Sequence, residues 1–376
     1  MPTFTSAWSF ATYLDISGFD EIVSIDVDFH GNNSSSFQSL ERLEFSNTRQ
    51  WEKWECQAVT GAFPNLRILS IKDCPKLKGQ LPELLVPLKK LRIRECQQLE
   101  GFAPRALELQ LHDYGKVQLD WATMEWFRMG GHHMKALFSE RDGSHTLDEL
   151  EIEESISDDS KTPLVTFPLD SFPTVTKLVL SGFGNLQMIS IDQAHHDLED
   201  LIISKCPKLE SLPANMHVLL PSLWMLQITD CPRLKLLPNE GLPPELEEME
   251  LINCSRLVGS LKGAFTDSSS LKSLEISKLD AEGFPDEGLL PPSLTHLTIT
   301  DSPNLEELDY KGLSQLSSLR SLTLEYCPKL QCLPEQGLPQ SISNLRIINC
   351  PLLKQRCQRG GEDREKLAHI QYINLY

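Results

Sequence analysis

Apolar residues recur along the chain in one spaced pattern, Leu-x-x-Leu-x-Leu/Ile, which is often followed three residues later by Cys-Pro-x-Leu. Its last two apolar positions alternate with polar ones, which is typical of a β-strand with one buried face. We call the first residue of that alternating pair the anchor. Clear copies have their anchors at Leu69, Leu91, Leu201, Leu226, Met249, Leu322 and Leu345, and variant or weaker copies at Leu14, Leu43, Leu109, Phe127, Leu150, Leu178, Leu274 and Leu297.

About fifteen copies of a unit of roughly 20–29 residues indicate a leucine-rich-repeat solenoid. We expect an α/β fold in which one short strand per turn joins a parallel sheet on the concave face of a curved horseshoe, with a mostly irregular convex side. The leucines are predicted to be core, since one repeat cannot bury its own apolar face. The repeats predict a solenoid over residues 1–350, with a degenerate first turn, and a C-terminal cap or tail over 351–376.

The later repeats alternate in length. From Leu201 to Leu345 the anchors are separated by 25, 23, 25, 23, 25 and 23 residues, which implies a duplicated unit of 48 residues. The connecting segments alternate too: Gly-Leu segments near Gly241, Gly288 and Gly337 take turns with Ser-rich segments. Duplication of a pair of repeats is the simplest account.

Seven of the ten cysteines share one place in the repeat, which predicts one small buried side chain per turn rather than disulfide pairs. The proline that often follows has no N–H to donate, so it is expected to end the strand. We read no export signal at the N-terminus, and reduced thiols in a cytoplasmic protein are the expectation. The seven are Cys74, Cys96, Cys206, Cys231, Cys254, Cys327 and Cys350.

Charge and hydropathy exclude several classes of function. Asp and Glu number 53 against 35 Lys and Arg, a formal net charge of -18, which disfavours a general nucleic-acid binder. No apolar run reaches the roughly 18–20 residues that cross a bilayer. An acidic chain of this kind favours solubility and basic partners.

A search for catalytic chemistry finds no phosphate-binding loop, nucleophile elbow or kinase motif, so we expect no enzyme and no cofactor. Metal binding is also not expected. The histidine pairs His132-His133 and His195-His196 are read as solvated loop residues, and Glu153-Glu154 and Asp158-Asp159 as solvated acidic segments.

Strand residues that point away from the core carry clustered charge, and we predict a partner-binding surface there. The predicted basic zone consists of Lys72, Lys90, Arg92 and Arg94, with Arg128 two turns further on. Predicted acidic zones follow at Glu149, Glu151 and Glu153 and at Glu248 and Glu250. A mixed C-terminal patch consists of Ile252, His296, Thr298, Thr323, Arg346 and Ile348.

The repeats resemble the leucine-rich-repeat domain of plant intracellular nucleotide-binding leucine-rich-repeat disease-resistance proteins of the coiled-coil class. The resemblance rests on the recurring Cys-Pro-Lys-Leu, as at Cys74–Leu77, on residues 16–46 with the following Trp51-Glu52-Lys53-Trp54, and on the ending at 350–373. It implies plant innate immunity, with a pathogen effector, a guarded host protein or a nucleotide-binding domain as partner. The chain shows no nucleotide-binding domain, so we expect either a receptor fragment or a repeat-only relative.

Two other classes use such repeats. An F-box-type substrate adaptor or another cytosolic scaffold is the alternative, although an F-box needs a helical segment before the repeats. An extracellular receptor, or an inhibitor of wall-degrading enzymes, is expected to show a signal peptide and an Asn-x-Leu-x-Gly-x-Ile-Pro pattern. We find neither in the sequence.

Overall fold

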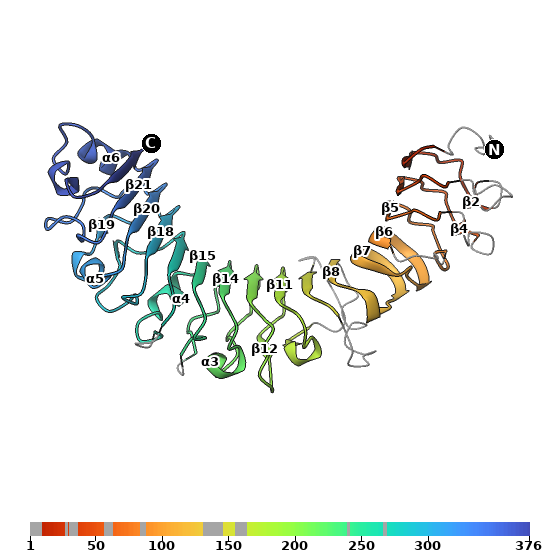
Figure 1. Ribbon diagram of the computed structural model, residues 1–376, viewed down its shortest axis with the longest axis horizontal. Coiled ribbons are helices and arrows are strands. Elements are labelled where there is room, and N and C mark those ends of the chain that lie inside the picture. Colours follow the sequence, from red (N-terminus) through yellow and green to blue (C-terminus); the bar gives the residue numbers. More distant parts are fainter. Residues whose placement is uncertain are drawn as a thin grey trace. The chain divides into compact units, whose positions relative to one another are not determined.

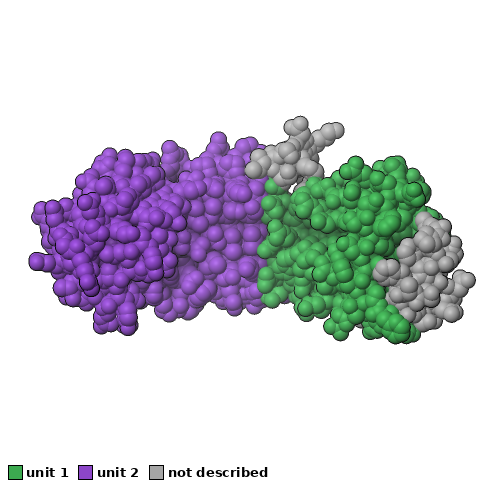
Figure 2. Space-filling view, turned by 90° about the horizontal axis from the view of Figure 1, so that it is seen from above, with its two compact units in different colours: residues 1–160 green, residues 161–376 purple. Residues whose placement is uncertain are grey.

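The computed structural model describes residues 10–26, 29, 37–55, 63–82, 88–130, 146–154, 164–238, 241–265 and 269–376. The chain divides into two compact units, residues 1–160 and 161–376, which are coloured separately in Figure 2. Each unit is a stack of turns that contribute one strand apiece to a parallel sheet.

The sheet of unit 1 contains, in order, β1, β3, β5, β6, β7, β8 and β9, and every neighbouring pair is parallel. Two further strands, β2 and β4, form a small parallel pair of their own. The bounds are β1 Tyr13–Ser17, β2 Ser24–Ile25, β3 Arg42–Ser46, β4 Lys53–Trp54, β5 Ile68–Lys72, β6 Leu88–Phe102, β7 Ala106–Gln118, β8 Trp126–Gly130 and β9 Glu149–Glu153, with a 3-10 turn at Trp121–Thr123.

The sheet of unit 2 runs β11, β13, β14, β15, β16, β18, β20, β21 and β22, and β10/β12 and β17/β19 form small pairs. In Figure 1 its strands line one side while α3, α4 and α5 lie on the opposite side. The bounds are β10 Thr166–Pro168, β11 Lys177–Ser181, β12 Met188–Ser190, β13 Asp200–Ser204, β14 Met225–Thr229, β15 Glu248–Ile252, β16 Ser273–Ser277, β17 Gly283–Phe284, β18 His296–Thr300, β19 Glu307–Leu308, β20 Ser321–Glu325, β21 Asn344–Ile348 and β22 Tyr372–Leu375. The helices are α3 Met216–Leu219, α4 Ser255–Gly259, α5 Tyr310–Ser314 and α6 Pro351–Cys357, and 3-10 turns lie at Leu169–Ser171 and Glu365–Leu367.

The predicted core is confirmed. Each of the fifteen anchors lies in a strand of one of these sheets, and none is more than 8% exposed. Successive strands pair anchor against anchor, as Leu201 with Leu226 and Leu226 with Met249. The fold is a leucine-rich-repeat solenoid in each unit, because the same inward positions stack from turn to turn.

Most strands end at a residue with left-handed backbone, which the sequence analysis missed. Lys205 has φ 53° and Tyr326 has φ 52°, although bulky side chains disfavour this region. The N–H of this residue donates to the last strand residue of the next turn, as Lys205 to the Thr229 carbonyl at 2.9 Å. The geometry therefore turns the chain and ties neighbouring turns together. The same place is taken by Gly18, Asn47, Asp73, Glu95, Asp113, Gly182, Asp230, Asn253, Lys278, Asp301 and Asn349.

The residue after this left-handed position is the predicted cysteine corner. All seven corner cysteines are free and at most 4% exposed, which confirms that these seven turns each hold a buried, unpaired thiol. Each thiol donates a hydrogen bond to the carbonyl two residues earlier, as Cys206 Sγ to Ser204 O at 3.3 Å. Where serine replaces cysteine, Ser302 Oγ makes the same bond to Thr300 O at 3.0 Å. Where the corner residue is cysteine or serine, its side chain thus satisfies a backbone carbonyl, whereas Phe183 and Leu279 fill the same place with buried apolar side chains.

Two strands of unit 1 depart from the regular length. β6 has 15 residues and β7 has 13, whereas the other strands of the unit 1 sheet have five. The corner residue of β6 is followed by Gln97 instead of proline, and that of β7 by Gly115. Both strands therefore keep an N–H at the corner, and the pairing continues to Phe102 opposite Gln118. A missing proline does not by itself lengthen a strand, because β3, β11, β15 and β16 also lack it and have five residues each.

The connecting segments of unit 2, opposite its main-sheet strands, alternate in structure as the duplicated 48-residue unit predicts. The short helices α3, α4 and α5 lie in the segments after β13, β15 and β18. The segments after β14, β16 and β20 carry Gly241, Gly288 and Gly337, each with positive φ, and contain no helix among their described residues. The alternating segment lengths therefore correspond to two alternating backbone paths.

The C-terminal tail adds one strand, because β22 pairs in parallel with β21. It is fastened by Asp363, whose side chain is 1% exposed and contacts Lys366 Nζ at 2.8 Å and Arg356 Nε at 3.0 Å. Asp363 also accepts the Leu333 N–H at 3.0 Å. Burial favours the neutral acid, but these hydrogen bonds outweigh it and lower the pKa of Asp363. The boundary between a solenoid at 1–350 and a cap at 351–376 stays a prediction.

Candidate functional site on the strand face of unit 1

The outward residues of unit 1 form rows across the sheet, because the strands pair in register. One row runs Ser70, Arg92, Gln110 and Arg128 from β5 to β8. The row beside it runs Lys72, Arg94, His112 and Gly130. The register brings together Lys72, Arg92, Arg94 and Arg128, which the sequence analysis placed in one basic zone.

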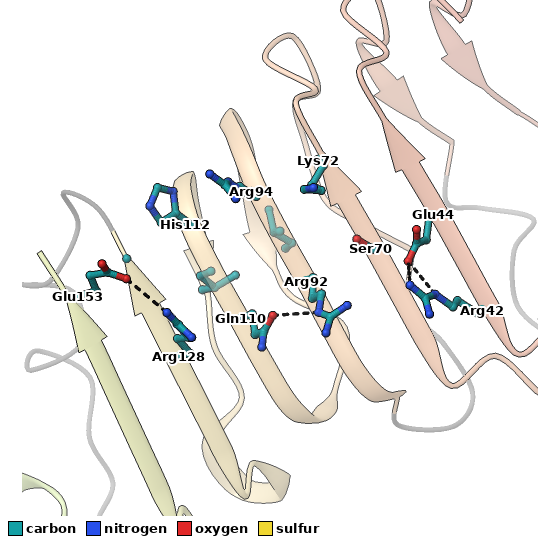
Figure 3. A pocket seen from close by; sticks show the side chains of 13 residues that line it. Arg42, Glu44, Ser70, Lys72, Arg92, Arg94, Gln110, His112, Arg128 and Glu153 are labelled. Carbon is teal, nitrogen blue, oxygen red and sulfur yellow. Dashed lines mark hydrogen bonds and ion pairs between the residues drawn. The ribbon is translucent and has the colours of Figure 1, made fainter. Parts of the chain in front are cut away.

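These rows line a hollow of about 590 Å³ on the strand face, seen from close by in Figure 3. Its floor includes Ser70 and Gly130, whose short side chains leave room between longer neighbours. A Cβ on Gly130 would lie 2.5 Å from the His112 ring, so this end of the hollow requires glycine or a moved ring. The lining residues are Arg42, Glu44, Ser70, Lys72, Arg92, Ile93, Arg94, Gln110, Leu111, His112, Arg128, Gly130 and Glu153.

Two ends of this hollow are closed by ion pairs within the chain. At one end the Arg42 guanidinium binds Glu44 on the same strand, β3. At the other end Arg128 on β8 contacts Glu153 on β9 at 3.4 Å (Figure 3). It also contacts Glu151 on the same strand at 3.3 Å. The first predicted acidic zone therefore meets the basic zone and neutralises Arg128 instead of standing apart from it.

The middle of the hollow keeps its positive charge. Lys72 makes no ion pair with any described residue, and Arg92 donates only to the neutral Gln110 amide oxygen, at 2.9 Å. Arg94 lies 3.4 Å from Glu95, but both side chains are about half exposed, so water weakens that pair. We call Lys72, Arg92 and Arg94 the basic centre. It lies between the two closed ion pairs.

Lys90 lies apart from the basic centre. Its ammonium contacts Glu108 at 2.8 Å and lies 4.9 Å from the centre of the Trp126 ring. Its side chain is only 18% exposed, and it does not line the hollow. Lys90 is held by its own neighbours on β7 and β8, since it occupies the row that contains Glu108 and Trp126. Glu149 belongs to that same row.

The other predicted positions lie in unit 2 and do not form one cluster. Glu250 pairs in register with Glu275, and burial together with repulsion from Glu275 raises the pKa of Glu250. Glu248 and His296 share a different row, separated by Ser273. Arg346 contacts Glu325 at 3.4 Å.

The structure describes only some of the histidine and acidic residues that the sequence analysis considered as metal ligands and read as solvated. His195 is a correction: it is buried rather than solvated, with Nε2 2.8 Å from the Phe172 carbonyl and Nδ1 accepting the Leu198 N–H at 3.1 Å. His196 is exposed. His132-His133 and Asp158-Asp159 lie outside the described residues. Within the described ranges, no group of three or more His, Cys, Asp or Glu side chains is placed to hold a metal.

Sequence reasoning missed Arg42, Glu44, Ser70, Gln110, His112 and Gly130, all of which line the hollow. The repeat pattern could have identified them, since each occupies an outward position of a strand. The sequence does not show which of these side chains contact one another across neighbouring turns.

None of the helices in the described part of the chain is long and apolar enough to span a membrane.

The chain is similar in sequence to known plant proteins. No family model matches the chain. An Arabidopsis thaliana protein named for disease resistance (At3g14460) is 28% identical over 350 residues, which is 83% of this chain and 23% of that protein. The Arabidopsis thaliana disease resistance RPP13-like protein 1 is 29% identical, over 65% of this chain and 18% of its own length. The relatives of this chain are plant disease-resistance proteins. The chain spans less than a quarter of the length of these disease-resistance relatives.

Two solved structures have low similarity to the chain. CroV588, described as a circular leucine-rich-repeat protein, is 14% identical with a TM-score of 0.39, over 82% of this chain and 46% of that chain. TLR13 in complex with the RNA ssRNA13 is 15% identical with a TM-score of 0.42, over 98% of this chain and 65% of that chain. The disease-resistance relatives, not these structures, indicate the biological setting.

Proposed function

We propose that this chain is a non-catalytic recognition module of plant defence that binds an acidic segment of a partner protein on the strand face of unit 1. The single observation that carries the proposal is the basic centre, three cations with no close internal carboxylate except the exposed Glu95, in a chain of net charge -18. Complementary charge both steers and orients a protein partner.

The partner in this proposal is a pathogen effector, a guarded host protein or, if the chain is part of a longer receptor, a nucleotide-binding domain that the repeats hold inactive. The disease-resistance relatives support the proposal of a role in plant defence. The basic lining of the hollow supports the proposal that the bound segment is acidic. The proposed compartment is the cytoplasm, in keeping with nine described cysteines that are all free.

The test uses a fluorescein-labelled peptide of ten alternating Asp and Gly residues, with binding read by fluorescence anisotropy. The variant Lys72→Glu, Arg92→Glu, Arg94→Glu is expected to weaken binding at least tenfold, since three exposed attractions of about 0.5–1 kcal/mol each become repulsions. Binding of the unaltered chain should also weaken as salt is added.

The matched control is Lys76→Glu, Lys89→Glu, Lys116→Glu, which makes the same change of net charge at exposed positions of unit 1 outside the hollow. It should bind nearly as well as the unaltered chain. Circular dichroism must show both variants folded. Equal affinities of the two triple variants would refute the site, because binding would then follow net charge alone.

A further inference from the structure

A second hollow, of about 640 Å³, lies in unit 2 at the edge where the chain enters strands β16, β18 and β20. Hydroxyl side chains dominate its lining, together with two cations and one carboxylate. The lining residues are Glu247, Ser269, Ser270, Lys272, Ser293, Thr295, Ser317, Ser318, Arg320 and Ser341. None of them belongs to the basic centre of unit 1.

The hollow is built from the duplicated 48-residue unit. Ser269-Ser270-Leu271-Lys272 recurs as Ser317-Ser318-Leu319-Arg320, with the leucine buried in both copies. The cation comes directly before β16 in the first copy and directly before β20 in the second. Because β18 lies between these strands, the two cations start about 10 Å apart.

The two copies differ in what neutralises the cation. Lys272 donates its backbone N–H to the Glu247 carbonyl of the preceding turn, and its ammonium binds the Glu247 carboxylate. That ion pair lowers the pKa of Glu247. Arg320 makes the equivalent backbone bond, at 2.9 Å, to Thr295. Thr295 carries no charge, and Arg320 makes no ion pair with any described residue.

The hydroxyls around Arg320 are of two kinds. Ser293 donates to the Leu271 carbonyl and Ser341 to the Leu316 carbonyl, so their protons are used within the chain. Ser317 and Ser318 make no side-chain hydrogen bond to a described residue and line the hollow beside Arg320. One guanidinium and two hydroxyl donors therefore line a hollow whose one lining carboxylate, Glu247, is already paired with Lys272.

We infer that Arg320, Ser317 and Ser318 form a binding site for a phosphate monoester on a partner protein, a phosphoserine or phosphothreonine. The phosphate takes at Arg320 the place that the Glu247 carboxylate takes at Lys272. A guanidinium binds two oxygens of an oxyanion side by side, which occupies both oxygens of a carboxylate. A phosphate has a third oxygen for the serine hydroxyls.

The test is fluorescence anisotropy with the full chain and three labelled peptides that differ only at a central phosphoserine, serine or glutamate in a Gly-Ala background. The phosphoserine peptide is expected to bind at least tenfold more tightly than either of the others. Inorganic phosphate added as competitor shows whether the free ion suffices: displacement at millimolar concentration supports the phosphate assignment. If the glutamate or serine peptide binds as tightly, the assignment is wrong.

Two variants remove the site by different routes. Arg320→Ala deletes the guanidinium, and Thr295→Glu installs beside Arg320 the carboxylate that Lys272 already has. Each should cost the phosphoserine peptide at least tenfold in affinity, while Arg256→Ala, at an exposed arginine of α4 outside the hollow, should cost less than twofold. Circular dichroism checks that each is folded. Unchanged binding in folded Arg320→Ala or folded Thr295→Glu would overturn the inference.

Discussion

The two units differ in how strictly they keep one repeat. In unit 2 the turns alternate between two backbone paths, and its main-sheet strands have five residues except β22, which has four. Unit 1 contains β6 and β7, which run on past their corners to 15 and 13 residues. The contrast teaches that the apolar anchors fix where a strand lies in the sheet, whereas the length of the strand can vary from turn to turn.

The largest expected effect tests the anchor positions that both units share. Leu201→Asp puts a carboxylate at a site that is 0% exposed and packed between β11 and β14. An unpaired buried charge should cost about 3–5 kcal/mol of the free energy of unfolding. Urea denaturation followed by circular dichroism measures it. Leu201→Met, of similar volume, is the control and should cost less than about 1.5 kcal/mol. An unchanged midpoint for Leu201→Asp would contradict the register.

A smaller effect addresses the irregular corner of unit 1. A Cβ on Gly115 would lie 2.1 Å from the Leu99 carbonyl oxygen and 2.8 Å from that of Gln97, so Gly115→Ala forces β6 and β7 apart. We expect a loss of about 2–3 kcal/mol, confined to unit 1. Hydrogen exchange read by mass spectrometry should show faster exchange over 97–118 and no change in unit 2.

The matched control for that change is Gly184→Ala in unit 2, where a Cβ meets no atom within 4 Å. It should leave exchange rates nearly unaltered. If Gly115→Ala behaves in the same way, the close approach of β6 and β7 at this corner is wrong.

The smallest effect concerns the left-handed corner residue. Lys205→Gly relieves a lysine held at φ 53°, so it should stabilise the chain by about 1 kcal/mol even though it removes a side chain. The neighbouring turn already has Gly182 there, with φ 75°. Gly182→Ala should destabilise by a similar amount. Thermal melts of the two variants should therefore shift in opposite directions, and shifts of the same sign would refute the account.

Most of the fold was readable from sequence because the inward positions repeat. Gly182, Asp230 and Asn253 also indicate the left-handed position, because such residues tolerate this backbone. Lys205 and Tyr326 occupy the same position although their residue types do not favour it, so the pattern is not evident from the sequence. The length of β6 was not predicted: Gln97 stands where many turns have proline, but β3 and β15 also lack that proline and have only five residues. The anchors can be predicted from the sequence of one turn, whereas the geometry of the corner depends on backbone hydrogen bonds to the next turn.

The candidate sites were less readable because charge on a strand face is settled by neighbours 18 to 26 residues away. Lys90 and Arg92 look alike in sequence, but only Lys90 has a carboxylate, Glu108, opposite it. His195 looked like a loop histidine and is buried against Phe172. Such differences depend on which side chain the following turn supplies.

The buried corner thiols can report when individual turns of the solenoid open. Burial raises the pKa of the corner thiol Cys254 to about 11, so almost no thiolate exists there at neutral pH while that turn is closed. All seven corner thiols are at most 4% exposed, so an alkylating reagent reaches a corner only when that turn opens. Since Cys206, Cys231 and Cys254 occupy the same corner in three successive turns, the order of their labelling traces how opening spreads through that part of unit 2, without any added probe.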